Sequence, residues 1–236
     1  FLPVTISLIK MNAHTKFLRN LFLILKKFLE GVKIFIFLLK YFLSLKFEVI
    51  TETLDKFLLK NSVSKHKPLS RSYFKMIEII NTFNLLDQYK DKNITSFHLA
   101  EGPGGFIEAL AYMRKNIYDK YIGITLLDTD SSIPNWGKCK DIIKKYPNIV
   151  LEYGADKTGD ILSNSNLRHC SNKYANSIDI ITGDGGFDFS LDFNNQEKQA
   201  SNLIFAEICF AVLLQKKGGT FILKFFDIFY KSSIDI

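Results

Sequence analysis

Asp184 and Lys224 are two charged residues that lie at or near the ends of apolar segments. Asp184 follows the segment 178–182 and has a glycine on each side, which clears space around its carboxylate. Lys224 interrupts the apolar run 221–226, and because burial of an isolated ammonium is costly, it needs a partner. Their separation of 40 residues fits a strand end, a crossover helix and the next strand, so we expect them to be neighbours. A lysine beside an aspartate can orient or deprotonate a hydroxyl group.

A glycine-rich turn lies between an apolar segment, 94–100, and an apolar helix that is predicted to start at Phe106. Its sequence, EGPGG at 101–105, lets the backbone adopt positive φ and approach a ligand, and the N–H groups of the helix start are expected to be unpaired. The turn lacks the Gly-Lys-Ser/Thr end of a phosphate-binding loop and the third glycine of the dinucleotide fingerprint. It fits the loop under the amino-acid half of S-adenosylmethionine (SAM). The alternative is a strand-to-helix turn without a ligand.

Strand-like and helix-like segments alternate through the rest of the chain, which predicts an α/β fold with a doubly wound, Rossmann-like parallel sheet. In such sheets ligands bind at the carboxyl ends of the strands, where Asp184 is expected. The predicted strands are 94–100, 121–127, 149–152, 177–182 and 220–226, and the main predicted helices are 106–115, 137–145 and 196–216, with Gly218-Gly219 ending the last one.

Five short motifs follow one another between positions 68 and 230. They are SRSYFKMIE at 70–78, GPGGF at 102–106, TGDI at 158–161, DGGFD at 184–188 and LK at 223–224. In this order they resemble the FtsJ-like RNA ribose 2′-O-methyltransferases, within the mRNA cap-specific branch found in eukaryotes and large DNA viruses. Five motifs in the right order are far more specific than any one of them.

The resemblance implies which residues form the site. The family's catalytic tetrad is Lys-Asp-Lys-Glu, and its first three members match Lys75, Asp184 and Lys224. The fourth, a glutamate on a later strand, has no counterpart in this chain. The family's cofactor-binding positions match Gly102, Pro103, Gly104, Gly105 and Phe106, with Asp160 and Ile161 against the adenine.

These residues suit the methylation of a ribose hydroxyl in RNA. Because such a hydroxyl is a poor nucleophile near neutral pH, attack on the SAM methyl group needs a base and tight orientation. We expect Lys224 to be that base or to orient the hydroxyl, and Asp184 to hold Lys224 and face the cofactor. A sulfonium methyl group needs no metal, so none is expected. The resemblance implies the first transcribed nucleotide of capped mRNA as substrate, and capping-machinery proteins as partners.

Each of these residues also has a structural interpretation. Lys224 could pair with Asp184 for stability alone, Lys75 could be a solvated lysine of an amphipathic helix, and Asp160 could form a turn and helix cap. His98 stands where relatives often have an acidic residue, so either Glu101 supplies that carboxylate or His98 is a core histidine with satisfied hydrogen bonds. Which residue of 125–130 meets the cofactor ribose is left open.

The position of the last residue, Ile236, predicts that the chain is truncated. It lies ten residues past the fifth strand, whereas this fold normally adds a further helix and a closing strand pair. The first residue is Phe1, and Met11 is an alternative start. We therefore predict function for the parent protein.

The charge of the chain is uneven. The net charge is +7, and residues 1–75 hold 14 Lys and Arg against 4 Asp and Glu. A basic N-terminal part fits a polyanionic partner such as RNA. The three cysteines have no metal or disulfide spacing, which favours an intracellular, reducing compartment, either cytoplasm or nucleus.

The composition predicts a basic, apolar, helical N-terminal extension, 1–66. The resemblance implies a methyltransferase domain, 67–236, that is incomplete at its C-terminus. No uncharged run within 17–50 exceeds six residues, so we predict an amphipathic helix and not a membrane span. The charged residues that share one face of this helix are Arg19, Lys26, Glu30, Lys33 and Lys40. The alternatives are a helix on a membrane surface, or a first 60 or so residues that are loosely ordered or not authentic coding sequence.

Three functions follow from the sequence. The first is SAM-dependent 2′-O-methylation of capped mRNA. The second is methylation of ribose in rRNA or tRNA by the same fold, which the GDGGFD segment at 183–188 argues against. The third is a catalytically silent RNA-binding or scaffold subunit, which the presence of Lys75, Asp184 and Lys224 argues against.

Overall fold

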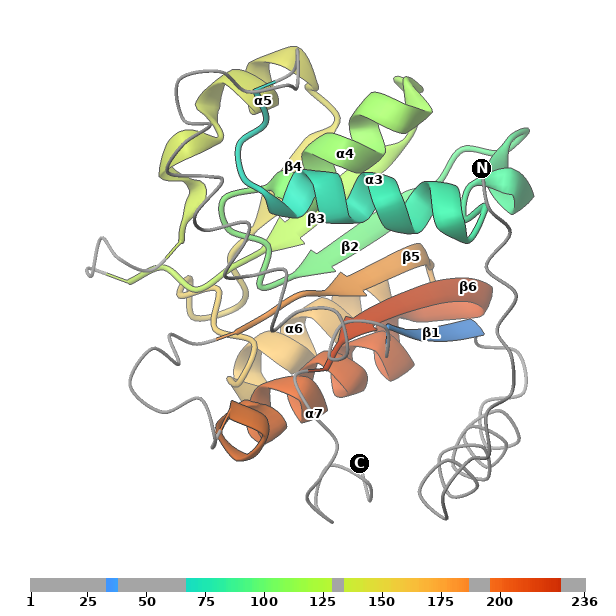
Figure 1. The fold of residues 1–236 in the computed structure, drawn as a ribbon. Helices are drawn as coiled ribbons and strands as arrows, with labels where there is room; N and C mark the ends of the chain where they lie inside the picture. Colours follow the sequence, from blue (N-terminus) through green and yellow to red (C-terminus); the bar gives the residue numbers. More distant parts are fainter. Residues whose placement is uncertain (1–32, 38–66, 129–133, 187–195, 226–236) are drawn as a thin grey trace.

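A computed structural model describes residues 33–37, 67–128, 134–186 and 196–225 (Figure 1). Its centre is a six-stranded sheet in the order β1-β6-β5-β2-β3-β4, in which all the paired strands are parallel. The strands are β1 (Lys33–Phe37), β2 (Thr95–Leu99), β3 (Lys120–Ile124), β4 (Ile149–Glu152), β5 (Ile178–Gly183) and β6 (Gln215–Lys224). The predicted doubly wound sheet is confirmed.

Helices cover both faces of this sheet (Figure 1). One hydrophobic cluster joins the sheet to α3 (Ser72–Thr82), α4 (Gly105–Arg114) and α5 (Lys140–Lys145). A second cluster on the other face joins it to α6 (Asn164–Tyr174) and α7 (Gln196–Leu214). Because successive side chains of a strand point to opposite faces, one buried strand such as β2 contributes to both layers.

Three predicted helices differ from the observed elements. Residues 33–37, predicted to be helical, form β1 and pair with β6; the remainder of 17–50 lies outside the described residues. The predicted helix 137–145 is a 3₁₀ turn, Trp136–Lys138, followed by α5. Finally, Gly218-Gly219 does not end a helix, because α7 stops at Leu214 and both glycines lie inside β6.

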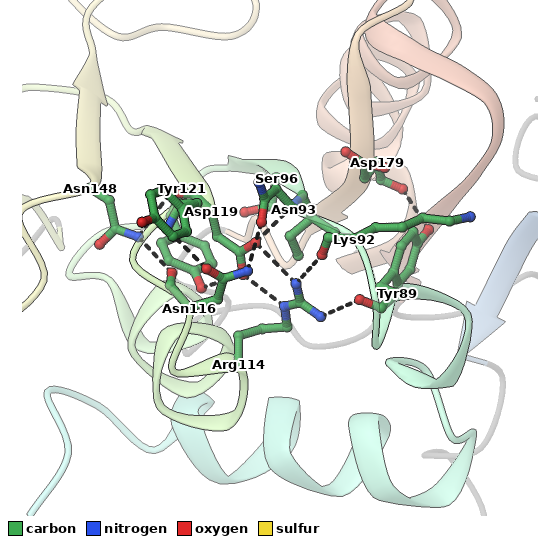
Figure 2. Close-up of polar contacts among 12 residues, drawn as sticks. Tyr89, Lys92, Asn93, Ser96, Arg114, Asn116, Asp119, Tyr121, Asn148 and Asp179 are labelled. Atoms are coloured by element: carbon green, nitrogen blue, oxygen red, sulfur yellow. Dashed lines mark hydrogen bonds and ion pairs between the residues drawn. The ribbon is translucent and has the colours of Figure 1, made fainter.

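A polar cluster closes the edge of the sheet where the strands begin (Figure 2). The Arg114 Nε lies 2.7 Å from Asp119 Oδ2, and both side chains are almost fully buried. The same guanidinium donates to the carbonyl oxygens of Tyr89 and Lys92, each at 2.6 Å. Tyr121 donates its hydroxyl to Asp119 Oδ2 at 3.0 Å. These bonds tie the end of α4 to the loop that enters β2 and leave the opposite edge for ligands.

Among the residues that the structure describes, no helix is long and apolar enough to cross a membrane.

Candidate active site

The order of the strands places a crevice between β2 and β5. From β2 the chain proceeds to β3 and β4 on one side, and then returns to β5 on the other side of β2. The loops that leave β2 and β5 therefore turn away from each other, and such a switch point is where open α/β sheets bind ligands. The glycine-rich turn 101–105 follows β2, and Asp184 follows β5 directly.

Asp184 joins the two lysines predicted for the site. The Lys75 Nζ lies 2.6 Å from Asp184 Oδ2, and the Lys224 Nζ lies 3.1 Å from Asp184 Oδ1. Lys224 also donates to the backbone carbonyl oxygen of Asp184 at 3.0 Å. The structure thus brings together α3, the end of β5 and the end of β6, as the sequence predicted.

These three side chains and Phe106 line one pocket. Its other lining residues include Glu78 and Leu223, so the pocket lies between α3, the start of α4 and the ends of β5 and β6. The side chains of Lys75, Asp184 and Lys224 are 34%, 16% and 27% exposed. Both ammonium groups are therefore partly sheltered and still accessible to a substrate.

Opposing influences act on the pKa of Asp184. Burial acts to raise it, but the ammonium groups of Lys224 and Lys75 outweigh burial, so the pKa of Asp184 is lowered. The carboxylate is consequently ionised at neutral pH. It can accept hydrogen bonds from both lysines at once.

The start of α3 sets the position of Lys75. The Leu69 backbone N–H donates to Glu108 Oε2 of α4 at 2.8 Å, and this glutamate is buried. A Cβ on Gly105 would overlap the hydroxyl oxygens of Ser70 and Ser72, so both serine side chains would have to move, and the glycine lets α3 begin close against α4. The glycine of the turn thereby positions a lysine that is 30 residues away in the sequence.

The glycine-rich turn is held by a buried glutamate. Gly104 has φ of 114°, a conformation that glycine adopts without the cost that a side chain would add, and it caps α4. Glu101 Oε1 accepts the backbone N–H groups of Phe106 and Ile107 at 2.8 and 3.0 Å. The expectation that these N–H groups are unpaired is therefore wrong, because a buried carboxyl group needs hydrogen-bond donors and the helix start supplies them.

His98 is a core histidine with satisfied hydrogen bonds. It is fully buried, with Nε2 2.8 Å from Ser96 Oγ and Nδ1 2.9 Å from Thr182 Oγ1. Burial lowers its pKa to about 3, so the ring is neutral. Of the two alternatives left open by the sequence, the structural one is correct for His98. Glu101, in the turn that follows β2, is the acidic residue of this segment.

Asp160 and Ile161 lie in the loop after β4. Asp160 Oδ1 accepts the Leu162 N–H at 2.8 Å, which makes a local turn, and its carbonyl oxygen accepts from Asn166 at 2.9 Å. The side chain of Asp160 is half-buried and that of Ile161 is buried. The predicted turn is thus confirmed, but the predicted helix cap is wrong, because the N-cap residue of α6 is Ser163. Contact with an adenine stays a prediction.

Glu207 is a residue of the site that sequence reasoning missed. It lies in α7, is 1% exposed, and its Oε1 accepts the Gly185 N–H at 3.0 Å. A lone glutamate in the apolar run LIFAEICFAVLL, 203–214, was the available signal. In the part of the chain that the structure describes, no group of three or more His, Cys, Asp or Glu residues is placed to hold a metal ion.

Comparison with protein families matches residues 68–234 to the FtsJ-like methyltransferase model. The chain belongs to the FtsJ-like methyltransferase family. The match covers the glycine-rich turn, the Asp184 loop and Lys224 together, which confirms the resemblance carried by the motifs.

Relatives of this methyltransferase include enzymes named for mRNA cap modification. A cap-specific mRNA (nucleoside-2′-O-)-methyltransferase 2 of Danio rerio is 31% identical over 187 residues, which are 70% of this chain and 23% of that protein. A cap-specific mRNA (nucleoside-2′-O-)-methyltransferase of Autographa californica nuclear polyhedrosis virus is 29% identical over 167 residues, 70% of this chain and 59% of that one. The chain thus spans about a quarter of the first relative.

A third relative is also named for mRNA cap modification, with the number 1 in its name. It is the cap-specific mRNA (nucleoside-2′-O-)-methyltransferase 1 of Dictyostelium discoideum, 31% identical over 151 residues, 57% of this chain and 20% of that protein. Among solved structures, a methyltransferase chain from Methanococcus maripaludis has 20% identity and a TM-score of 0.36, with 74% of this chain and 73% of that one covered. That likeness is too low to carry an argument.

Proposed function

We propose that this methyltransferase transfers a methyl group from SAM to a ribose 2′-hydroxyl of RNA, on the first transcribed nucleotide of capped mRNA. The observation that carries the proposal is the Lys75, Asp184 and Lys224 cluster, which lines one pocket with Phe106 of the glycine-rich turn. Family membership and the names of the cap-specific relatives support it.

The turn after β2 suits the cofactor. Gly102, Pro103, Gly104, Gly105 and Phe106 lie at the switch point, and Phe106 borders the same pocket as Lys224. Bound SAM would supply a methyl group on a sulfonium that becomes a neutral thioether after transfer. We place the amino-acid half of SAM over this turn and assign Asp160 and Ile161 to the adenine.

Lys224 has the position of the group that handles the hydroxyl. In the proposed step the ribose oxygen forms the new bond to the methyl carbon, the carbon–sulfur bond breaks, and the hydroxyl proton passes to Lys224 after its ammonium group has released a proton to solvent. Asp184 accepts from Lys224 through both Oδ1 and its carbonyl oxygen, which fixes the direction of the Nζ lone pair or N–H groups. If Lys224 is charged, the same geometry orients the hydroxyl by hydrogen bonding.

Lys75 completes the charge balance of the pocket. Its Nζ contacts the Asp184 oxygen that Lys224 does not use. Glu78 also lines the pocket, so two lysines face two carboxyl groups, and the attraction of the phosphates that flank a ribose falls to basic residues outside the pocket. The basic N-terminal part of the chain, 1–75, adds to that attraction.

A panel of RNA substrates tests the proposal. With labelled SAM, we expect methyl transfer to capped RNA and none to uncapped RNA or ribosomal RNA. Capped RNA already methylated at the first nucleotide should accept no further label. Label on this substrate would assign the second nucleotide, transfer to ribosomal RNA would favour the rRNA or tRNA enzyme, and SAM binding without transfer would favour the silent subunit.

A further inference from the structure

Glu207 is a buried carboxyl group that lies directly behind the Asp184 turn. It belongs to α7, on the sheet face opposite α3, and its side chain is 1% exposed. Its Oε1 accepts the backbone N–H of Gly185 at 3.0 Å. No step of the proposed reaction uses Glu207, so the reason for a buried acid at this position has to be found in its contacts.

The side chain of Glu207 occupies the space beside both glycines that flank Asp184. A Cβ on Gly183 would lie 2.7 Å from Glu207 Cδ, and a Cβ on Gly185 would lie 2.8 Å from Glu207 Oε1. Real Cβ atoms do not approach other atoms this closely, so a side chain at either position would displace the Glu207 carboxyl group. The glycines therefore admit the glutamate as well as clearing space around Asp184.

The backbone that Glu207 holds is the backbone that orients Lys224. The carbonyl oxygen of Asp184 accepts from the Lys224 Nζ at 3.0 Å, and this carbonyl belongs to the same peptide unit as the Gly185 N–H. Rotation of that peptide would move both groups together. Glu207 on one side and Lys224 on the other thus bind the two ends of a single peptide dipole.

The protonation of Glu207 is compatible with such a role. Burial raises its pKa to about 8, against the opposing effects of the Gly185 hydrogen bond and Lys224, while Asp184 acts to raise it further. A neutral carboxyl group still accepts a hydrogen bond through its carbonyl oxygen. A glutamine should therefore reproduce the contact, and a leucine of similar size should not.

We infer that Glu207 is a positioning residue, which orients the Asp184–Gly185 peptide through the Gly185 N–H and so fixes Lys224 for methyl transfer. This inference rests on the proposed function of the same site. A glutamate that only fills space in the core would contribute to stability and leave the geometry of Lys224 unchanged.

The test compares Glu207→Gln and Glu207→Leu with Phe210→Leu, a buried control on the same helix whose ring packs against Phe97 of β2. Steady-state methyl transfer to capped RNA gives kcat and KM, and calorimetry gives the SAM affinity. We expect Glu207→Leu to lower kcat by about tenfold or more, the effect of one lost buried hydrogen bond, with KM and SAM affinity within about twofold. Glu207→Gln should keep most of kcat, and Phe210→Leu should lower stability only.

Amide hydrogen exchange at Gly185 provides a readout that does not depend on activity. We expect exchange to be about tenfold faster in Glu207→Leu and unchanged in Glu207→Gln. Unchanged exchange in Glu207→Leu, an unchanged kcat in that variant, or equal losses in both Glu207 variants would each overturn the inference. Absence of methyl transfer by the wild-type protein would instead contradict the proposed function, and the exchange result would still decide the role of Glu207.

Discussion

Asp184 contacts the ammonium groups of Lys75 and Lys224. Because the carboxylate is largely buried, it needs these two partners. The carboxylate is 16% exposed and uses one oxygen for each lysine. Burial alone would raise its pKa, whereas the two cations lower it, so the ionised form is the one that the fold stabilises. Lys224 is consequently held in place by a group that stays charged through the neutral pH range.

Replacement of Lys224 separates catalysis from cofactor binding. We expect Lys224→Ala to lower the rate of methyl transfer by about 100-fold or more, because the base or hydroxyl-orienting group is lost. SAM affinity should stay nearly unchanged, since the proposed cofactor contacts lie on the glycine-rich turn. The matched control is Lys217→Ala, an exposed lysine of the same strand. Wild-type turnover in Lys224→Ala would rule out its assigned role.

The buried Glu101 predicts how stability depends on pH. Burial raises its pKa from the ordinary value of 4.5 to about 8. The folded protein therefore binds a proton that the unfolded chain releases, so this stabilising contribution is complete below pH 4.5 and is lost as pH rises through 8. Urea unfolding of wild type and of Glu101→Gln at several pH values between 5 and 9 measures how the free energy of unfolding changes with pH.

We expect the free energy of unfolding of wild type to fall with rising pH more steeply than that of Glu101→Gln. The glutamine can accept the Phe106 and Ile107 N–H groups but has no proton to lose. His98 and Glu207 titrate in both proteins, so their contributions cancel in the difference. Parallel pH profiles for the two proteins would mean that Glu101 is ionised in the folded state.

The turn between β2 and α4 depends on the left-handed backbone at Gly104, whose φ is 114°. We expect Gly104→Val to weaken SAM binding by about tenfold or more, because a side chain there strains the turn by about 1–3 kcal/mol and enters the space beside Leu69. Gly218→Val is the control, since Gly218 also has a positive φ, of 81°, with open space around it. Equal SAM affinity in both variants would mean that the turn has a structural role and does not bind SAM.

The Arg114 and Asp119 pair secures the opposite edge of the sheet. Removal of one member of a buried ion pair leaves the other charge unpaired, so Asp119→Ala should lower the free energy of unfolding by about 3–5 kcal/mol. The exposed Asp91, changed to alanine, provides the control. Urea denaturation measures both effects. A loss below about 1 kcal/mol in Asp119→Ala would show that the pair is dispensable.

Local sequence patterns predicted the buried strands and the long helices, and failed where distant pairing decides the structure. Strands β2 to β6 follow from short apolar runs, since each is buried on both faces. The end of α7 was misplaced because Gln215 to Lys217 look helical, yet they begin β6, where Gln215 pairs with Ile178 of β5. Helix α6 was missed because it is largely polar, with Asn166, Cys170 and Tyr174 forming its buried stripe.

The charged residues of the candidate site could be predicted from the sequence, but the buried residues that hold them in place could not. Lys75, Asp184 and Lys224 could be named because charges at strand ends and ordered motifs are visible in the sequence. Glu101 and Glu207 could not be assigned, since their roles depend on which N–H groups the fold brings to them. A sequence pattern gives the residue types, whereas burial and hydrogen-bond partners arise only from packing.

In the molecule as a whole, the proposed reaction depends on three segments that meet only after folding. Helix α3 brings Lys75, β5 brings Asp184 and β6 brings Lys224, over sequence separations of 109 and 40 residues. The central pair β2 and β5 fixes the crevice, and the helices on both faces exclude water from beneath it. The predicted domain boundary near residue 66 stays a prediction, with β1 contributed from before it.

The measurement that tests the central claim most directly is transfer of labelled methyl from SAM to two matched capped RNAs. One has an ordinary ribose at the first transcribed nucleotide, and the other has 2′-deoxyribose there. The account predicts labelling of the first RNA by wild type and by Lys217→Ala, loss of labelling with Lys224→Ala, and no labelling of the deoxy RNA. Equal labelling of both RNAs, or full labelling by Lys224→Ala, would contradict it.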